Sequence, residues 1–516
     1  MRSKQLLVVL ALVILVVAAA PAHAGGEVDV CDEDSLRTAL SGGGLVTFNC
    51  SGTIALDNRI IITADTTIDG SATAVTISGN NAVQVFHVNS GVTLNLKGLT
   101  IADANAKDNT TAGGGAVETW GGSVTIDNCS FLNNTAWSGG AILCEFGTVT
   151  VSHSTFANNT AFDESAYGGA IFCEDSTLTV VDSTFSGNGA LTGGAIYSSN
   201  GILTVSRSTF SNNTTSDWSG GAIAAIGTAE VSNSTFYGNQ APNEYGGAIA
   251  NRGDLTVTNC TFSNNAAYYV YGGAIFNYCT SSLCGTVTLE NSIVANSTSG
   301  GNCYGPITDG GGNLSYPDTS CPGINQNPYL GLLQDNGGPT WTMAPGSGSA
   351  AIDAADNDTC AAPPINNLDQ RGVGRPKPVG GICDIGAVEQ DGVSLTRFWP
   401  IDIKPGSDPN SINCRAANGV ITVAILTADT RDAMIIDHAT VIFEGARETH
   451  VHKKTGEPIR HVEDVDGDGD MDLVLHFRLG DTALICDSTE AVLLGRTFDG
   501  EPIAGADYVR MVPSRK

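Results

Sequence analysis

The chain has 516 residues and a formal net charge of −29, from 53 acidic and 24 basic side chains. This balance excludes a nucleic-acid binder built on a basic groove, and a content of 41% apolar residues excludes an acidic disordered chain. Glycine contributes 63 residues, about 12% of the chain against an average of roughly 7%. Such an excess is typical of many short strands joined by tight turns.

The N-terminus has the pattern of a secretory signal peptide over residues 1–24. Arg2 and Lys4 precede an apolar run over 6–20, and Ala22-His23-Ala24 is a small-x-small cleavage site. The run is shorter than a typical ~20-residue membrane span, which favours cleavage over an N-terminal membrane anchor. We expect an exported mature chain without a transmembrane helix, because no later stretch is long and apolar enough to cross a bilayer.

All 14 cysteines follow the signal sequence, and an even number in an oxidising compartment predicts disulfides. No Cys-x-x-Cys motif or Cys/His cluster has the spacing of zinc ligands. The candidate disulfide pairs that lie close in sequence are Cys31–Cys50, Cys279–Cys284, Cys303–Cys321 and Cys360–Cys383.

A repeat with a period near 26 residues dominates the middle of the chain. Phe-x-x-Asn recurs in phase with Gly-Gly-Ala-Ile/Val, and each unit holds three short β segments with Gly or Asn at the bends. Three strands per turn at this period predict a parallel β-helix, whereas a leucine-rich repeat needs a leucine framework and a propeller blade needs a longer period. The Gly-Gly string begins at Gly114, Gly139, Gly168, Gly193, Gly220, Gly246 and Gly272.

Stacked coils place equivalent residues about 4.8 Å apart. We therefore expect an inner aromatic column from Phe131 to Phe262 and an inner aliphatic column from Ile142 to Ile275. A further column stands two or three residues before each Phe, where Asn tolerates the left-handed region and stacked amides can bond along the axis. Its members are Asn128, His153, Asp182, Arg207, Asn233, Asn259 and Asn291.

These paired strings resemble the repeats of polymorphic outer membrane proteins and, more broadly, of secreted right-handed β-helices of the pectin-lyase fold. The resemblance covers roughly 45–300 and implies an adhesin-like surface protein. Residues 27–105 have the pattern of N-terminal capping coils, so the β-helix with its cap is expected over 25–326.

The repeat ends before residues 327–390. Blocks at 330–340, 349–353, 369–372 and 383–389 resemble, in that order, the choice-of-anchor Q segment. That segment follows such β-helices in secreted bacterial and archaeal proteins, and the resemblance implies a C-terminal cap.

The last part, 391–516, has the alternating strands of a small all-β domain and contains a strongly acidic loop. Carboxylates at loop positions 1, 3, 5 and 9, with Gly at position 6, match the logic of a calcium loop, although position 12 is Leu475 instead of Glu. We expect Ca²⁺ as a structural cofactor here; the alternative is a solvated acidic turn. The predicted ligands are Asp464, Asp466, Asp468, Asp470 and Asp472.

Two groups are candidates for catalysis. His153, Asp182 and Arg207 replace Asn in consecutive coils, where they suit acid/base work on a uronic-acid polymer or, as we favour, a charge-compensated ladder. Glu145 and Glu174 occupy equivalent positions about 5 Å apart, a separation that suits a retaining glycosidase pair or a calcium site; a surface pair without function is favoured. Each follows a cysteine, Cys144 or Cys173, and these two thiols could bond.

A third group is an aromatic row just before the Gly-Gly strings, in a chain poor in aromatic residues. Exposed rings along a rod make a stacking surface for sugar rings or a partner; the alternative is a hydrophobic cover for the loops. The row contains Trp137, Tyr167, Trp218, Tyr245 and Tyr271.

Together these patterns predict an all-β chain, a right-handed parallel β-helix followed by a small C-terminal β domain with a calcium loop. We expect a secreted or cell-surface binding and adhesion protein, extracellular or associated with the outer membrane, that recognises a glycan or a cell-surface partner and no nucleic acid. The alternative is a polysaccharide lyase or glycoside hydrolase, because the same fold hosts both.

Overall fold

The computed structural model describes residues 25–106, 113–162, 166–217, 219–268, 271–280, 284–346, 348–377, 379–390, 399–407, 409–428, 431–486, 488–499 and 502–512. The predicted signal peptide, residues 1–24, and the predicted binding residue Trp218 lie outside these ranges.

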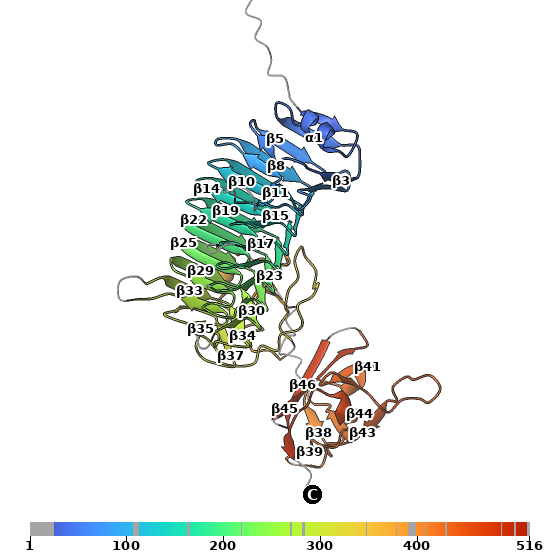
Figure 1. Ribbon diagram of the computed structural model, residues 1–516. Helices are drawn as coiled ribbons and strands as arrows, with labels where there is room; N and C mark the ends of the chain where they lie inside the picture. Colours follow the sequence, from blue (N-terminus) through green and yellow to red (C-terminus); the bar gives the residue numbers. More distant parts are fainter. Residues whose placement is uncertain are drawn as a thin grey trace, which may run out of the picture.

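The larger part of the described chain is a right-handed parallel β-helix of about nine turns, which confirms the predicted fold class. Its coils stack from helix α1 (Glu33–Ala39) at one end to strand β37 at the other (Figure 1). Asp32 caps α1, accepting a hydrogen bond from the Ser35 N–H at 2.8 Å.

The coils build three parallel sheets from the described strands. The largest sheet has 20 strands: β1 (Gly25–Val28), β2 (Gly44–Phe48), β4 (Ile60–Ile62), β5 (Thr66–Asp69), β7 (Phe86–Val88), β8 (Thr93–Lys97), β10 (Val117–Trp120), β11 (Ser123–Asp127), β14 (Ile142–Glu145), β15 (Thr148–Ser152), β18 (Ile171–Glu174), β19 (Thr177–Val181), β22 (Ile196–Ser206), β25 (Ile223–Ser232), β28 (Ile249–Asn251), β29 (Asp254–Thr258), β32 (Ile275–Asn277), β33 (Thr286–Glu290), β35 (Cys303–Tyr304) and β36 (Thr308–Gly311). The second has 11: β3 (Gly52–Ala55), β6 (Val75–Ser78), β9 (Thr100–Ala102), β12 (Ser130–Leu132), β16 (Thr155–Ala157), β20 (Thr184–Ser186), β23 (Thr209–Ser211), β26 (Thr235–Tyr237), β30 (Thr261–Ser263), β34 (Ile293–Ala295) and β37 (Leu314–Tyr316). The third has six: β13 (Thr135–Ala136), β17 (Thr160–Ala161), β21 (Gly189–Ala190), β24 (Thr214–Thr215), β27 (Gln240–Ala241) and β31 (Ala266–Ala267).

The core of the β-helix consists of the two predicted columns. The Phe rings stack nearly parallel, with neighbouring centroids 4.7–4.9 Å apart, and are fully buried. The isoleucines from Ile142 to Ile275 align in register on the largest sheet and are also buried. One residue type thus fills the same place in successive coils, which fixes the strand register.

Hydrogen bonding along the axis runs through a different column from the one predicted. The asparagine of each Phe-x-x-Asn string is buried, and from Asn159 onward its Oδ1 accepts the backbone N–H and the Nδ2–H of the asparagine one coil earlier, at 2.9–3.0 Å. Its Nδ2 also donates to the carbonyl of the preceding coil's Phe. This asparagine ladder satisfies backbone groups that the bend turns inward, away from water. It consists of Asn134, Asn159, Asn188, Asn213, Asn239 and Asn265.

The column that begins at Asn128 has the predicted backbone conformation but not the predicted axial amide bonds. All seven members have φ between 44° and 52°. Their described amides bond outward: Asn233 donates to the carbonyl of Leu368 at 3.0 Å, and Asn291 to that of Asp356 at 2.9 Å. The column therefore turns the chain and meets a neighbouring segment.

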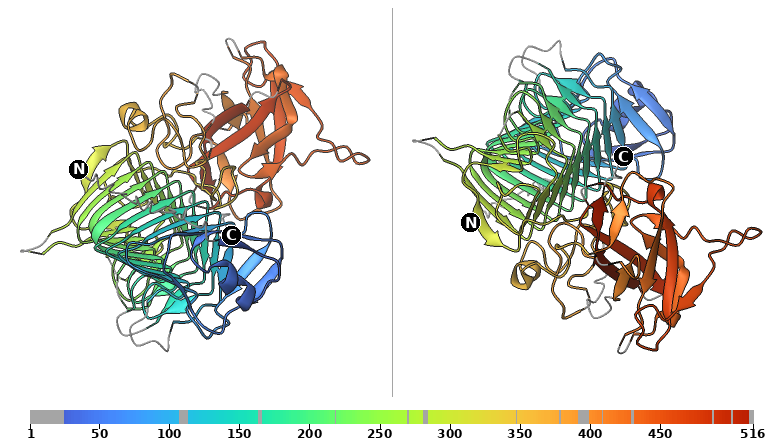
Figure 2. Two further views of the ribbon diagram at one scale, coloured as in Figure 1. Left: turned by 90° about the horizontal axis from the view of Figure 1, so that it is seen from above. Right: turned by 90° about the horizontal axis from the view of Figure 1, so that it is seen from below.

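That neighbouring segment, residues 327–390, is called the strap below. It contains α2 (Asn357–Ala361) and runs along the side of the coils (Figure 2). Gln370 accepts a hydrogen bond from the Thr235 hydroxyl at 2.6 Å and donates to the Thr209 hydroxyl at 3.0 Å. The segment predicted to cap the end of the β-helix thus also contacts the flank of several coils.

Two of the sequence blocks by which the strap was recognised, 369–372 and 383–389, contribute charged side chains to one buried network. The fully buried Arg375 donates to the carbonyl of Gly386 at 3.2 Å and lies 3.8 Å from the Glu389 carboxylate. Arg371 donates to Asp369 at 2.8 Å. Burial, followed by repulsion from Glu389, raises the pKa of Asp384 to about 7. The charged side chains of residues 369–389 can therefore be buried because they compensate one another's charge.

The described residues from 399 onward form the separate small β domain that was predicted, with its own core around Phe443 and Phe477. Its antiparallel sheets are β38 (Ile401–Ile403), β40 (Val420–Ile425), β44 (Asp472–Arg478) and β43 (His461–Glu463) in that order, and β42 (Ala446–Arg447), β41 (Ile436–Phe443), β45 (Glu490–Thr497) and β46 (Pro502–Tyr508). A short parallel pair is β39 (Ser411–Asn413) and β47 (Arg510–Val512). Two 3₁₀ turns are η2 (Ala433–Ile435) and η3 (Leu479–Asp481).

The four candidate disulfides are formed, and Cys414–Cys486 in the small domain is a fifth. Cys144 and Cys173 form no disulfide; they are buried thiols side by side in register. Cys129 and Cys260 are also buried free thiols, at separate places in the array. Burial raises the pKa of Cys129 to about 11 and of Cys260 to about 12, so both stay protonated.

The asparagine ladder gives a direct test of what holds the coils together. Asn213→Ala should lower the free energy of unfolding by about 2–6 kcal/mol, because it leaves the Asn188 N–H and the Phe185 carbonyl buried without partners, at about 1–3 kcal/mol per group. Thr214→Ala, at the exposed neighbouring position, should change it by less than about 0.5 kcal/mol. Urea unfolding followed by circular dichroism measures both, and equal effects would contradict the ladder's role.

Candidate binding site on the outer face of the β-helix

The structure brings the predicted His153, Asp182 and Arg207 together as neighbours. Arg207 donates from Nε and Nη2 to the two carboxylate oxygens of Asp182, at 2.8 and 2.7 Å. His153 lies with Nε2 3.7 Å from Asp182 and Nδ1 3.1 Å from Asp127. The four side chains form an alternating row of acids and bases along the axis.

This row has the geometry of a charge-compensated ladder. The Asp182 side chain is only 8% exposed, and both its oxygens are occupied by Arg207. A bidentate guanidinium occupies both oxygens of a carboxylate and leaves neither free for a substrate proton. The exposed His153 lies between two carboxylates, those of Asp127 and Asp182.

Glu145 and Glu174 are also adjacent, at the ends of β14 and β18 and in register. Burial, followed by repulsion from Glu174, raises the pKa of Glu145. Within the described residues neither side chain forms an ion pair or hydrogen bond. The pair therefore has the like-charge repulsion of two carboxylates but no bonded cation that would position a substrate.

The predicted aromatic row divides into two clusters. Tyr167 stacks beside Tyr197, with centroids 4.6 Å apart, and near Phe172. Further along, Tyr245 lies 4.7 Å from Tyr271, and both contact rings of the largest sheet. Trp137 stands apart: it is 38% exposed and meets the edge of Phe162 at 6.5 Å.

Among the described residues, a gap separates the clusters because each of two columns changes to small residues in two successive coils, and the two changes overlap in the coil of Ser219 and Ala224. The residue before Gly-Gly is Thr192 in one coil and Ser219 in the next, between Tyr167 and Tyr245. On the largest sheet, the outward column reads Phe172, Tyr197, Ala224, Ala250, Phe276 and Tyr304 in register. The two alanines leave a notch between Tyr197 and Phe276, three strand spacings or about 14 Å apart along the axis.

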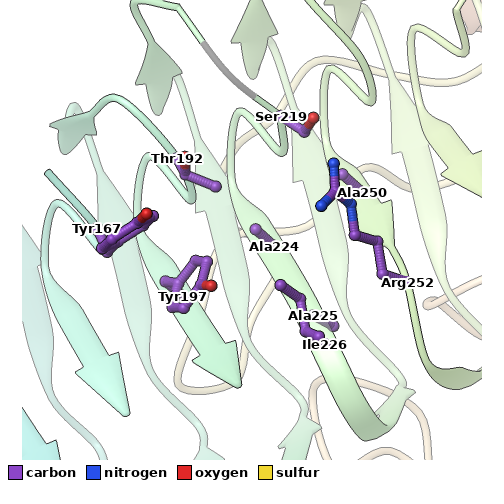
Figure 3. A pocket seen from close by; sticks show the side chains of 9 residues that line it. All are labelled: Tyr167, Thr192, Tyr197, Ser219, Ala224, Ala225, Ile226, Ala250 and Arg252. Atoms are coloured by element: carbon purple, nitrogen blue, oxygen red, sulfur yellow. The ribbon is translucent and has the colours of Figure 1, made fainter. Parts of the chain in front are cut away.

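The notch is a pocket of about 100 Å³ with one aromatic wall and one charged wall. In Figure 3, Tyr167 and Tyr197 form one side, Ala224 and Ala225 the floor, and Arg252 the other side. Within the described residues, Arg252 has its Cζ 4.5 Å from the Tyr278 ring centroid and forms no ion pair. The guanidinium therefore keeps N–H donors for a ligand.

Sequence reasoning missed Tyr197, Arg252 and the alanines of the notch. The notch could have been predicted from missing aromatic residues, because Ala224 and Ala250 occupy positions at which the flanking coils have aromatic rings. Tyr167, Tyr245 and Tyr271 were predicted from the other column, just before Gly-Gly, and of these Tyr167 lines the pocket.

The acidic loop between β43 and β44 gathers part of its predicted ligand set. One oxygen from each of Asp464, Asp466 and Asp472 lies within 4.8 Å of the others; Asp468 and Asp470 are not in this group. The backbone N–H of Asp468 lowers the pKa of Asp466, but burial and repulsion from Asp468 and Asp472 outweigh it and raise that pKa. The loop thus holds converging carboxylates that repel one another.

Two families match parts of the chain. The family described as right handed beta helix region matches residues 84–205. The repeat of the Chlamydia polymorphic membrane protein matches residues 207–226 and 259–278, each of which contains one Phe-x-x-Asn and one Gly-Gly-Ala-Ile string. No curated protein matches the chain. Among the described residues, no helix has the length and apolar character needed to span a membrane.

The ladder at Arg207 can be tested by restoring the asparagine that is usual in its column. Arg207→Asn should lower the free energy of unfolding by about 1–3 kcal/mol, because the buried Asp182 loses its cation. Asp182→Asn/Arg207→Asn should return to within about 0.5 kcal/mol of the wild type, because Asn suits the same left-handed bend. Chemical denaturation measures both variants; a double variant as unstable as the single one would contradict the ladder.

Proposed function

We propose that the protein is an exported adhesion protein of the cell surface or extracellular space, whose β-helix recognises a glycan at the notch. The observation that carries the proposal is the meeting of two tyrosine rings, an alanine floor and an arginine that has no carboxylate partner within the described part of the chain. Flat rings pack on the apolar faces of sugar rings, and a guanidinium donates to hydroxyl or carboxylate oxygens. The matched surface-protein repeats support an external location.

The size of the notch limits what one site can do. At about 100 Å³ it is smaller than the ~300–1,000 Å³ of sites that enclose a drug-sized ligand. It therefore suits one sugar ring of a longer chain, and the second aromatic cluster around Tyr245 and Tyr271 lies further along the same rod. Weak contacts repeated along one polymer would add by avidity.

The enzymatic alternative finds less support. The two oxygens of Asp182 are both bonded to Arg207, and Glu145 and Glu174 have no bonded cation among the described side chains. A lyase or hydrolase needs a free base or an acid/nucleophile pair at the bond that breaks.

Glycan binding should be lost when either wall of the notch is removed. Tyr197→Ala and Arg252→Ala should each weaken binding on a polysaccharide array by about tenfold, since one ring or charged contact is worth about 1–1.5 kcal/mol. Ala224→Phe should block the notch with the residue type found at this position in flanking coils. The matched control is Trp120→Ala, an exposed ring at the end of β10 on the same sheet.

Two outcomes would contradict the proposal. One is unchanged binding in all three notch variants, which would put the ligand elsewhere. The other is release of reducing or unsaturated sugar by the purified wild type, which would favour the enzyme. Circular dichroism shows that each variant keeps its fold.

We also propose that the acidic loop binds Ca²⁺ as a structural cofactor. Oxygens within 4.8 Å of one another suit a cation whose oxygen ligands stand 2.3–2.6 Å away, because opposite ligands are then about 5 Å apart. Asp472 is buried and already fixed, accepting hydrogen bonds from the Thr427 and Val465 N–H groups at 2.8 Å. Gly467 and Gly469 have φ of 79° and 99°, which lets the loop fold around a cation.

Removal of calcium should destabilise the small domain. Adding a calcium chelator should lower its thermal midpoint by several degrees, because an ion that binds only the folded state adds to stability. Asp464→Asn/Asp466→Asn should abolish this difference. Asp481→Asn, an exposed carboxylate of the same domain, should retain it. A wild-type midpoint that is the same with and without chelator would contradict a calcium site.

A further inference from the structure

Three histidines of the small domain meet on one side of a sheet, and together they are called the histidine cluster: His450, His461 and His476. One ring nitrogen of each lies within 4.8 Å of one ring nitrogen of each of the others. The rings of His450 and His461 stack with centroids 4.6 Å apart, and His476 meets both edge-on at 5.8 and 5.5 Å.

Strand pairing brings these residues together from separate parts of the sequence. His461 on β43 pairs with Val474 on β44, and His476 stands two residues further along β44. Side chains two apart on a strand share a face, so His461 and His476 point to the same side. His450 lies in the loop between β42 and β43, where the Thr449 N–H donates to the His476 carbonyl at 2.8 Å.

A buried carboxylate fixes two of the three backbones. Glu448 accepts the N–H of His450 and the N–H of His476, each at 2.7 Å. Its Oε1 also lies 4.0 Å from Nδ1 of His476. That Nδ1 is buried and has no hydrogen-bond partner within the described residues. Outer carboxylates that orient ligand histidines are a regular feature of metal sites.

The closest two ring nitrogens of the cluster share one hydrogen bond. Nε2 of His461 and Nδ1 of His450 are 2.7 Å apart, a contact that takes one proton between two rings. A neutral imidazole keeps one lone pair for a further partner, and three converging lone pairs are what a transition-metal ion requires.

We propose that the histidine cluster binds one divalent transition-metal ion of the zinc class through three imidazole nitrogens. Imidazole selects Zn²⁺, Ni²⁺ or Cu²⁺ over Ca²⁺, which takes oxygen ligands, so this site is distinct in chemistry from the acidic loop. With metal–nitrogen bonds of about 2.0–2.1 Å, tetrahedral ligands lie about 3.3 Å apart. The 2.7 Å pair must therefore open by roughly 0.6 Å, and the exposed His450 on its loop is placed to move.

Three protein ligands leave one position for a fourth. His450 is exposed and the other two histidines are half-buried, so the open coordination position faces solvent. Sites with three protein ligands and an open position bind water or an external group there. The ion would tie the loop that carries His450 to the β43–β44 pair.

The experiment uses the mature full-length chain without a polyhistidine tag, freed of metal by chelator and returned to excess Ca²⁺. Titration with Zn²⁺ alone in a calorimeter should give one site with a Kd in the micromolar range or below. His450→Ala, His461→Ala and His476→Ala should each weaken binding at least tenfold. X-ray absorption of the Zn²⁺-loaded protein should show imidazole nitrogens in the first coordination sphere.

Matched controls separate this site from general histidine binding and from the calcium loop. His452→Ala, two residues from His450 but outside the cluster, and Asp464→Asn should bind Zn²⁺ like the wild type. His461→Gln keeps the size and polarity of the side chain, so it removes the ligand if His461→Ala fails to fold. Absence of a stoichiometric site, or wild-type affinity in the folded cluster variants, would overturn the proposal.

Discussion

The bend of each coil turns backbone N–H and carbonyl groups into the interior of the β-helix, and the rest of the structure depends on how these groups are bonded. Leaving one such group unpaired costs about 1–3 kcal/mol, and the bend recurs in every coil. The side chains of Asn134 through Asn265 meet this need with two hydrogen bonds to each following coil. A second row does the same at another bend, where the Ser183 and Ser208 hydroxyls accept backbone N–H groups at 3.1–3.2 Å.

Because inner columns fix the register, the outer columns are free to vary from coil to coil. A change from Tyr197 to Ala224 on the outside leaves the aligned Ile196 and Ile223 undisturbed. The same freedom allows a histidine, an aspartate and an arginine to stand in the asparagine column, where they compensate one another's charge. The proposed binding notch therefore lies where the outer residues depart from the repeat, whereas the repeated inner residues stabilise the rod.

The sequence was sufficient for the fold because repetition makes long-range contacts visible. Phe131 and Phe156 are predicted to stack only because both head the same string, and their rings are 4.7 Å apart. Periodicity does not say which of two asparagine columns faces inward, so the axial bonds were assigned to the wrong one. The strap was recognised by its blocks, but the contact of Gln370 with Thr209 and Thr235 joins residues more than 130 positions apart.

In the small domain the histidine cluster was harder to predict than the acidic loop, because it depends on pairing between unlike strands. His450, His461 and His476 follow one another at spacings of 11 and 15 residues, which match no metal-binding motif. The same hairpin carries both proposed ions: Glu463 pairs with Asp472 where the acidic loop closes, and His461 lies two residues away on β43. An ion in either place would hold β43 against β44, so each would favour the geometry that the other requires. Two ions that stabilise one strand pair raise each other's affinity by the same factor, so the two proposed sites would be coupled through this hairpin.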